Sequence, residues 1–237
     1  MVSRYSCPAP ARGRRKKESR LAIKRIIIFS GGRLGEWALS YISEGDWLVG
    51  ADSGARFLVA NGLKPRLAIG DFDSVSSEEL AQIGEVSEEL ISCDPVYKDF
   101  TDTEMAVEWA LSQCPDELLL LGALGTRMDH SLANMHLLRK ARDCGVQAVI
   151  ADDHNRIALT GEGETLRISK SESNFTHVSL LPLSLEVTGI TLEGFQYPLH
   201  RATLRLGQSL GISNVLNDAE GFVTTETGLL LVIQSRD

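Results

Sequence analysis

Several signals that mark common protein classes are missing from this chain of 237 residues. Its longest apolar runs, such as 118–121 and 229–233, are far shorter than the roughly 20 residues of a membrane-spanning helix. The five histidines show no metal-ligand spacing, and the four cysteines form no C-x-x-C pair. Scattered cysteines of this kind predict reduced thiols in a cytoplasmic protein rather than disulfides or a zinc site. They are Cys7, Cys93, Cys114 and Cys144.

Two common nucleotide-binding signatures are also absent. The chain contains no G-x-x-x-x-G-K-[ST] motif, which excludes a P-loop enzyme. Glycines at 31, 32 and 35 follow the first apolar run, but their spacing lacks the dinucleotide fingerprint. We interpret this segment as a strand-to-helix turn, with the lining of a nucleotide site as the alternative.

The charge is unevenly distributed. Residues 1–25 carry nine basic residues and one acid, whereas the rest of the chain carries 15 basic and 31 acidic residues, a net charge of −16. An acidic body argues against nucleic acid as the main partner. The basic leader, residues 1–22, lacks the apolar core of a secretory signal. We expect it to be disordered; a targeting peptide and a nucleic-acid tail are the alternatives.

The part from residue 23 to 155 alternates short apolar runs with helical patterns, which predicts crossover units on a parallel sheet. The continuous apolar run 26–29 suits a strand covered on both faces. The expected fold class here is α/β, an N-terminal open and mostly parallel sheet flanked by helices. Expected strands are 25–30, 47–51, 67–70, 90–93, 117–122 and 146–151, and expected helices are 34–42, 55–61, 77–83, 102–112 and 132–144.

From residue 156 to 237 the pattern changes to short β-rich runs separated by glycine turns, without helix-length periodicity. We therefore expect a second, C-terminal all-β domain, a small sandwich with a barrel as the alternative, and a boundary near 152–165. The segment 225–228, Thr-Glu-Thr-Gly, predicts a hairpin turn. Expected strands include 166–168, 177–181, 190–192, 202–206 and 229–233.

Two aspartates follow the predicted strand 67–70. Asp71 and Asp73 are two residues apart, so on extended chain their side chains point the same way. The carboxyl ends of strands in open α/β sheets are where ligands bind. Close carboxylates raise each other's pKa, and Mg²⁺ with an attached phosphate chain is the natural cation for such hard oxygen ligands. The alternative is that the pair only shapes a turn.

A second acidic segment begins at Lys98. Thr101 and Glu104 match a capping box, with Thr101 as the N-cap of a helix and Glu104 reaching back. Capping accounts for Glu104, but it does not explain Lys98 and Asp99, which place a cation beside three acids in one loop. The alternative for Asp102 and Glu104 is that they only complement the helix dipole, which is adequate for Glu104.

Two further segments follow predicted strands. Asp52 comes after the strand 47–51, where it either caps the next helix or lines the acidic cleft. The segment 122–134 contains glycines that let backbone amides approach a phosphate, and it opens a helix whose N-terminus favours an anion. Within it, Arg127 can hold phosphate oxygens in a bidentate way.

Together these segments resemble the thiamine pyrophosphokinase family. The resemblance covers residues 24–235 and both predicted domains, with the motifs in the same order along the chain. The matching motifs are 51–55 (Ala-Asp-Ser-Gly-Ala), 67–75 around Gly-Asp-Phe-Asp-Ser, 98–104 (Lys-Asp-Phe-Thr-Asp-Thr-Glu), 122–134 around Arg-Met-Asp-His, 178–183, 194–199 and 211–214.

The resemblance implies a transfer of the pyrophosphoryl group of ATP to the thiamine hydroxyl, with Mg²⁺ as cofactor and AMP as the leaving product. It further implies a homodimer with sites at the subunit interface. The implied residues are Asp71, Asp73 and Asp102 as metal-binding and catalytic carboxylates, Asp52, Lys98, Thr101, Arg127, Asp129 and His130 toward ATP, and Ser213 and Asn214 toward thiamine.

The chain departs from the family pattern at two positions. Ser53 and Thr126 stand where the family usually has glycine. Neither change removes a charged group. The side chain of Thr126, however, leaves less room for a phosphate to approach the backbone amides of this loop than glycine would. Two other functions remain as alternatives: the same chemistry on another hydroxymethyl acceptor such as a pterin, or a non-catalytic binder of thiamine or nucleotide. A non-catalytic binder would be expected to lack some of the cleft carboxylates, and here all are present.

Overall fold

The computed structural model describes residues 25–93, 99–171 and 174–237. These residues form two compact units that divide between Asp153 and His154. The predicted basic leader and Lys98 lie outside the described residues. Among the helices that are described, none combines the length and the hydrophobicity of a bilayer span.

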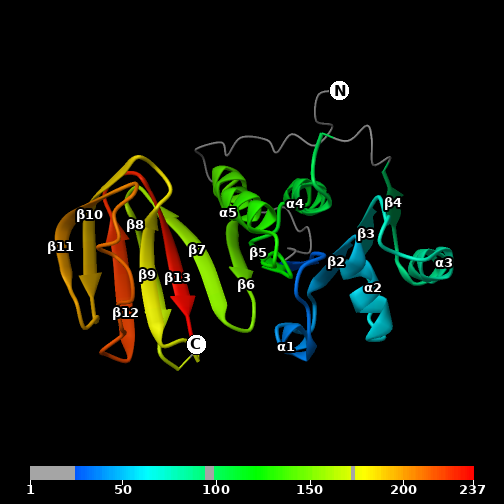
Figure 1. The fold of residues 1–237 in the computed structure, drawn as a ribbon, viewed down its shortest axis with the longest axis horizontal. Helices are drawn as coiled ribbons and strands as arrows, with labels where there is room; N and C mark the ends of the chain where they lie inside the picture. The colour runs from blue at the N-terminus through cyan, green and yellow to red at the C-terminus, as the bar shows by residue number, and fades with distance from the viewer. Residues whose placement is uncertain (1–24, 94–98, 172–173) are drawn as a thin grey trace, which may run out of the picture. The chain divides into compact units, whose positions relative to one another are not determined.

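A parallel sheet forms the centre of the first unit (Figure 1). Its strands are β1 (Arg25–Phe29), β2 (Trp47–Ala51), β3 (Leu67–Gly70), β4 (Leu90–Ser92), β5 (Glu117–Leu121) and β6 (Gln147–Ala151). They lie in the order β4-β3-β2-β1-β5-β6, and every neighbouring pair is parallel. The strand order reverses at β1, so the carboxyl ends of β1 and β5 flank a topological switch point, where open α/β sheets bind ligands.

Helices cover both faces of this sheet. They are α1 (Glu36–Leu39), α2 (Ser53–Ala60), α3 (Ser77–Val86), α4 (Asp102–Ser112) and α5 (Met128–Asp143). Figure 1 shows α4 and α5 on one face of the sheet and α1 and α2 on the other. Residues 26–29 of β1 are completely buried, as the unbroken apolar run predicts for a strand covered on both sides. The predicted α/β class is confirmed.

The helix boundaries show where local signals were incomplete. The helix predicted at 132–144 begins four residues earlier, because the carbonyl of Arg127 already accepts a hydrogen bond from the Ser131 amide. The capping box predicted for α4 is only half formed. Thr101 accepts from the Glu104 amide, but the Glu104 carboxylate accepts from Lys140 instead of reaching back. The Lys140 ammonium, which is distant along the chain, therefore replaces the Thr101 backbone amide as the hydrogen-bond donor to the Glu104 carboxylate.

The second unit is a sandwich of two antiparallel sheets, which confirms the predicted all-β class. One sheet has the order β7-β13-β9 and the other the order β11-β10-β12-β8. Val178, Leu230 and Val232 from the first sheet pack with Ile190 and Val223 from the second in one apolar core. The strands are β7 (Asn155–Gly161), β8 (Glu164–Ser169), β9 (His177–Pro182), β10 (Glu186–Glu193), β11 (Leu199–Arg205), β12 (Glu220–Thr225) and β13 (Leu229–Ser235).

The hairpin predicted at 225–228 is wrong. The turn joins β12 in one sheet to β13 in the other, so the two strands do not pair. The turn is held instead by β10, because Thr188 forms an isolated bridge with Thr227 and its carbonyl accepts from the amides of Glu226 and Thr227. The local turn residues were recognised correctly, but the partner strand is set by sandwich packing.

Candidate active site

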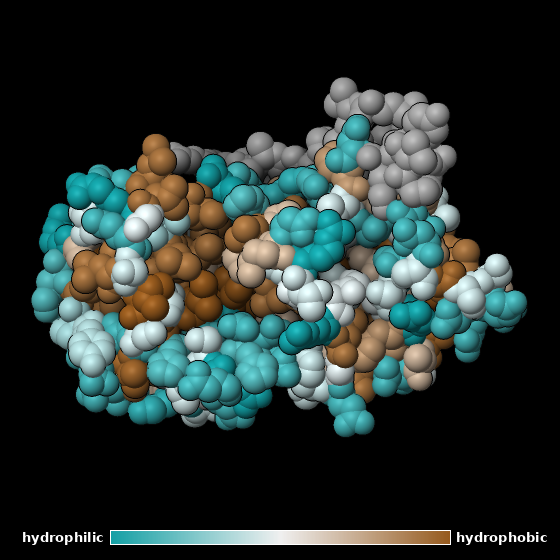
Figure 2. Space-filling view, in the orientation of Figure 1, coloured by the Kyte–Doolittle hydropathy of each residue, from teal (hydrophilic) through white to brown (hydrophobic). Residues whose placement is uncertain are grey.

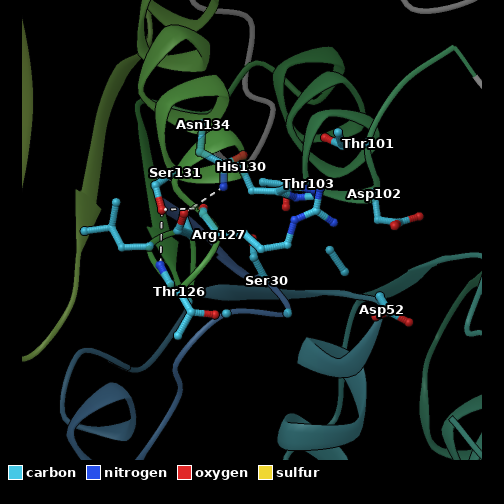
Figure 3. A pocket seen from close by; sticks show the side chains of 17 residues that line it. Ser30, Asp52, Thr101, Asp102, Thr103, Thr126, Arg127, His130, Ser131 and Asn134 are labelled. Atoms are coloured by element: carbon cyan, nitrogen blue, oxygen red, sulfur yellow. Dashed lines mark hydrogen bonds between the residues drawn. The ribbon is translucent and has the colours of Figure 1, made fainter. Parts of the chain in front are cut away.

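A pocket of about 280 Å³ opens at the switch point of the parallel sheet (Figure 3). It is formed by segments that follow β1, β2 and β5, together with the N-termini of α4 and α5. Its polar lining residues are Ser30, Asp52, Thr101, Asp102, Thr103, Thr126, Arg127, His130, Ser131 and Asn134, and the remaining positions are mostly glycine. The pocket therefore combines exposed backbone with side chains from four segments that are distant along the chain.

Three carboxylates converge beside this pocket. Asp52 follows β2, and Asp71 and Asp73 follow β3; each offers an oxygen, and these oxygens lie within 4.8 Å of one another. One oxygen of Asp52 accepts a 3.0 Å hydrogen bond from Ser74 Oγ. Its other oxygen is buried and has no hydrogen-bond partner within the described part of the chain. Hard oxygen ligands at this spacing, one of them buried and unpartnered, fit a divalent cation such as Mg²⁺.

The pKa of Asp52 reflects this environment. Burial raises the pKa of its carboxyl, against the nearby Ser53 backbone amide and the Ser74 hydroxyl, which lower it, and the negative charges of Asp102 and Asp73 raise it further. A carboxyl pKa raised by burial and by like charges is typical of functional sites. The backbone of Asp52 also adopts φ 50°, a region that non-glycine residues rarely occupy, which is typical of functional sites.

Asp102 approaches the same group from α4. A Cβ placed on Gly70 would lie 3.1 Å from the Asp52 amide nitrogen and 3.4 Å from the Asp102 carboxylate. The end of β3 thus runs close between the two aspartates, and a side chain at position 70 would crowd both. The structure brings together Asp52, Asp71, Asp73 and Asp102, although Asp102 does not belong to the three-residue group described above.

The opposite side of the pocket is rich in glycine. A Cβ on Gly32 would meet the carbonyl oxygens of Gly122 and Leu124 at 2.3 and 2.6 Å, so the loops after β1 and β5 can approach only because position 32 lacks a side chain. The Gly32 amide donates to the Gly122 carbonyl. This close approach shapes a backbone-lined wall of the kind that accepts phosphate.

Arg127 and Asp129 form an exposed ion pair at the start of α5, with 2.6 Å between the guanidinium and the carboxylate. The hydrogen bond from Arg127 lowers the pKa of Asp129. Arg127 lines the pocket, and Figure 3 shows its side chain extending toward the side where Thr103 and Asp102 lie. Asp129 is not among the lining residues, so its contact with the pocket runs through Arg127.

Two lining residues on α5 lie in the candidate segment 122–134, but they were not singled out from the sequence. Ser131 Oγ accepts from the Gly125 amide and donates to the Arg127 carbonyl, both at 3.2 Å. Buried Asn134 donates to the Ala123 carbonyl at 2.7 Å (Figure 3). They are three residues apart and so share one helix face, which is the signal that could have identified them. They fix the glycine-rich loop onto the helix.

The thiamine candidates lie in the second unit. Ser213 is exposed with φ 59°, and its amide donates to Ser179 Oγ at 3.0 Å. Asn214 is buried, and its amide group bonds both the carbonyl and the amide of Tyr197, at 2.7 and 3.1 Å. Asn214 therefore organises the loop around Tyr197, which leaves Ser213 as the exposed side chain of the pair.

Of the remaining candidates, Thr101 and His130 line the pocket, and Lys98 lies outside the described residues. A parallel sheet with its pocket at the switch point places the first unit in the class of α/β proteins that bind ligands at the carboxyl ends of strands. An acidic group beside a glycine-lined wall suits a ligand that brings phosphates together with a cation.

Comparisons with known proteins define the family. Residues 38–150 match the pattern described as "Thiamin pyrophosphokinase, catalytic domain", and residues 164–230 match "Thiamin pyrophosphokinase, vitamin B1 binding domain". The thiamine pyrophosphokinase of Bacillus subtilis (strain 168) is 35% identical over 217 residues, which cover 91% of this chain and 100% of that protein. The chain belongs to the thiamine pyrophosphokinase family, whose activity is ATP-dependent pyrophosphoryl transfer to thiamine.

Solved structures agree with this assignment. The crystal structure of the Bacillus subtilis thiamine pyrophosphokinase has a TM-score of 0.83 and 33% identity, covering 90% of this chain and 100% of that one. The yeast thiamin pyrophosphokinase has a TM-score of 0.74 at 15% identity, covering 90% and 86%, and so shows the shared fold. The resemblance inferred from sequence motifs is therefore confirmed at the level of family and of enzyme class.

Proposed function

We propose that this chain transfers the pyrophosphoryl group of ATP to thiamine at the pocket of the first unit. In this proposal Asp71, Asp73 and Asp102 hold Mg²⁺, with Asp52 beside them, and Arg127 holds phosphate oxygens. The observation that carries the proposal is the convergence of Asp52, Asp71 and Asp73 within 4.8 Å beside a glycine-lined pocket. A bound Mg²⁺ would neutralise phosphate charge and orient the phosphate chain.

The chain's own groups then position the reactants. The thiamine hydroxyl oxygen forms a bond to the β-phosphorus of ATP, the bond between that phosphorus and the bridging oxygen of AMP breaks, and a carboxylate of the site takes the hydroxyl proton. Arg127 would stabilise the charge that develops on the phosphate oxygens. Such transfers need little covalent help from the protein and depend mainly on positioning and charge.

The remaining candidates for ATP binding differ in whether they would contact the nucleotide directly. Thr101 and His130 line the pocket and would contact the nucleotide directly, whereas Asp129 would act by orienting Arg127 through their ion pair. Lys98 stays a proposal from the sequence alone. For thiamine, exposed Ser213 would supply a direct contact, and Asn214 would hold the surrounding loop.

The proposal is tested by supplying ATP, Mg²⁺ and thiamine to the purified protein and identifying the nucleotide product. We expect AMP and thiamine diphosphate in equal amounts. Formation of ADP, or tight binding of both substrates without turnover, would contradict the proposal. Offering a hydroxymethyl-pterin in place of thiamine should give no AMP; turnover with the pterin alone would identify a different acceptor.

We further propose a cytoplasmic homodimer. The second unit exposes large apolar side chains in the segments that connect its strands. Figure 2 shows hydrophobic surface on this unit. Leu185, Leu206 and Leu210 are 81%, 61% and 67% exposed, which is costly unless another surface covers them. A second copy is the proposed cover. Light scattering coupled to size exclusion should give twice the 25.9 kDa chain mass, and a monomer at micromolar concentration would contradict it.

A further inference from the structure

A charged cluster joins α4 to α5 outside the pocket. Lys140 on α5 donates to Glu104 at 2.7 Å and to Glu108 at 2.5 Å, two acids that lie one helical turn apart on α4. The same ammonium lies 5.7 Å from the centroid of the Phe100 ring, just before the helix begins. Lys140 thus contacts α4 and its entry at three points.

This cluster differs from an ordinary surface ion pair. The side chains of Lys140, Glu104 and Glu108 are 33%, 26% and 19% exposed. Burial works to lower the pKa of Lys140, but the hydrogen bonds to both glutamates outweigh it and raise the pKa. By contrast, the neighbouring pair Arg139–Asp143 stays within α5 and is about half exposed. Pairs of that exposed kind contribute little.

The position of the cluster connects it to the site. Glu104 belongs to the first turn of α4, directly after Thr101, Asp102 and Thr103, which line the pocket. The helix that carries Lys140 begins with the lining residues around Arg127 and His130. Lys140 lies in the last turn of α5, away from the pocket-lining start of that helix, so its bond to Glu104 anchors the first turn of α4 to the body of α5.

We propose that Lys140 is a positioning residue for the transfer reaction: it holds the first turn of α4, and with it Asp102, in place against the pocket. The inference rests on the proposed role of Asp102. Lys140 acts through Glu104 and touches neither substrate. Small displacements matter here, because misplacing a reacting group by about 1 Å costs on the order of a hundredfold in rate.

The test compares Lys140→Met with Lys140→Arg and with the matched control Arg139→Met, which removes the adjacent exposed ion pair. At a temperature where all variants are folded, Lys140→Met should lower kcat roughly 10- to 100-fold and leave the KM for thiamine unchanged. Lys140→Arg should restore most of the rate, because its guanidinium can bond both glutamates, and Arg139→Met should match the wild type. Wild-type kcat in folded Lys140→Met, with only a lower unfolding temperature, overturns the inference.

Two further variants keep the test decisive. If Lys140→Met does not fold, Glu104→Gln should lower kcat more than Glu108→Gln, since only Glu104 shares the first turn with Asp102; equal effects overturn the inference. Asp102→Asn separates the two proposals. An inactive Asp102→Asn beside an active Lys140→Met overturns the role of Lys140 alone, whereas an active Asp102→Asn overturns the proposed site and the inference with it.

Discussion

Ser74 holds one oxygen of Asp52 at 3.0 Å, while the other oxygen of the same carboxylate is buried without a partner among the described residues. The two residues follow different strands, β2 and β3, so their hydrogen bond ties together the loops that carry the acidic group. Evolution of such a half-satisfied carboxylate is hard to explain by stability alone, because a buried polar atom without a partner costs free energy. A cation bound as proposed would supply the missing partner.

The first prediction concerns the pH dependence of stability. Because burial raises the pKa of Asp52 above its ordinary value of 3.8, the folded protein holds this proton more tightly than the unfolded chain does. Ionised Asp52 therefore destabilises the fold at neutral pH, and the penalty disappears as the pH falls below that value. Asp52→Asn should unfold at a higher temperature than the wild type at pH 7 without metal, and the difference should shrink toward pH 4 and below.

Thermal unfolding monitored by circular dichroism across this pH range measures the difference directly. Glu78→Gln, an exposed acid in the first turn of α3, is the control and should show no such gain. An Asp52→Asn protein that is less stable at pH 7, or equally altered at every pH, would show that the carboxylate is a structural group.

The second prediction concerns the metal. Asp71→Asn and Asp73→Asn should each lower turnover by on the order of a hundredfold or more, because each removes a proposed ligand of Mg²⁺. Both variants should remain folded, since replacing one of several mutually repelling carboxylates relieves repulsion. Asp143→Asn, on the far end of α5, is the matched control and should keep wild-type turnover.

Mg²⁺ with ATP should raise the unfolding temperature of the wild type by mass action. The rise should be smaller in Asp71→Asn and Asp73→Asn and unchanged in Asp143→Asn. Near-normal turnover together with a full Mg²⁺-dependent rise in both variants would reject these carboxylates as the metal site.

Much of the first unit could be predicted from the sequence because its signals are local. The runs at 47–51 and 67–70 are buried strands as expected, and the helix at 102–112 begins and ends where predicted. β7 and β12 are not among the expected strands, because their partners β13 and β8 are distant along the chain. Sandwich pairing depends on contacts that no window of local sequence contains.

In the site, too, local sequence signals identified some residues, whereas contacts between distant segments could not be predicted. Carboxylates at strand ends identified Asp52, Asp71 and Asp73 as candidates, since parallel strands bring their carboxyl ends to one edge of a sheet. Sequence could not show that Lys140, distant along the chain, would take Glu104 away from its local capping role. Nor could it show that the Asn214 side chain would form hydrogen bonds with the backbone amide and carbonyl of Tyr197. For Glu104 a tertiary partner replaced the backbone donor that local spacing suggested.

The third prediction concerns the approach of the loops after β1 and β5. Gly32→Ala would place a methyl group 2.3 Å from the Gly122 carbonyl oxygen, far inside van der Waals contact, so the loops must separate. We expect the KM for ATP to rise at least tenfold, with a smaller effect on the KM for thiamine. Gly84→Ala in α3 meets nothing closer than 3.4 Å and is the control, with unchanged kinetics. Unchanged ATP affinity in Gly32→Ala would mean that this wall does not contact the nucleotide.

The last prediction separates the two thiamine candidates. Ser213 is exposed, and its side chain supports no described element, so Ser213→Ala should raise the KM for thiamine without changing stability. Asn214→Ala removes two bonds to the Tyr197 backbone and leaves that carbonyl and amide without their partner. It should therefore lower the free energy of unfolding by roughly 1–3 kcal/mol and also raise the KM for thiamine. Steady-state kinetics and urea unfolding of both variants measure the two effects separately. A stable Asn214→Ala with altered KM would assign Asn214 a direct contact with thiamine, because only a loop-holding role couples the two effects.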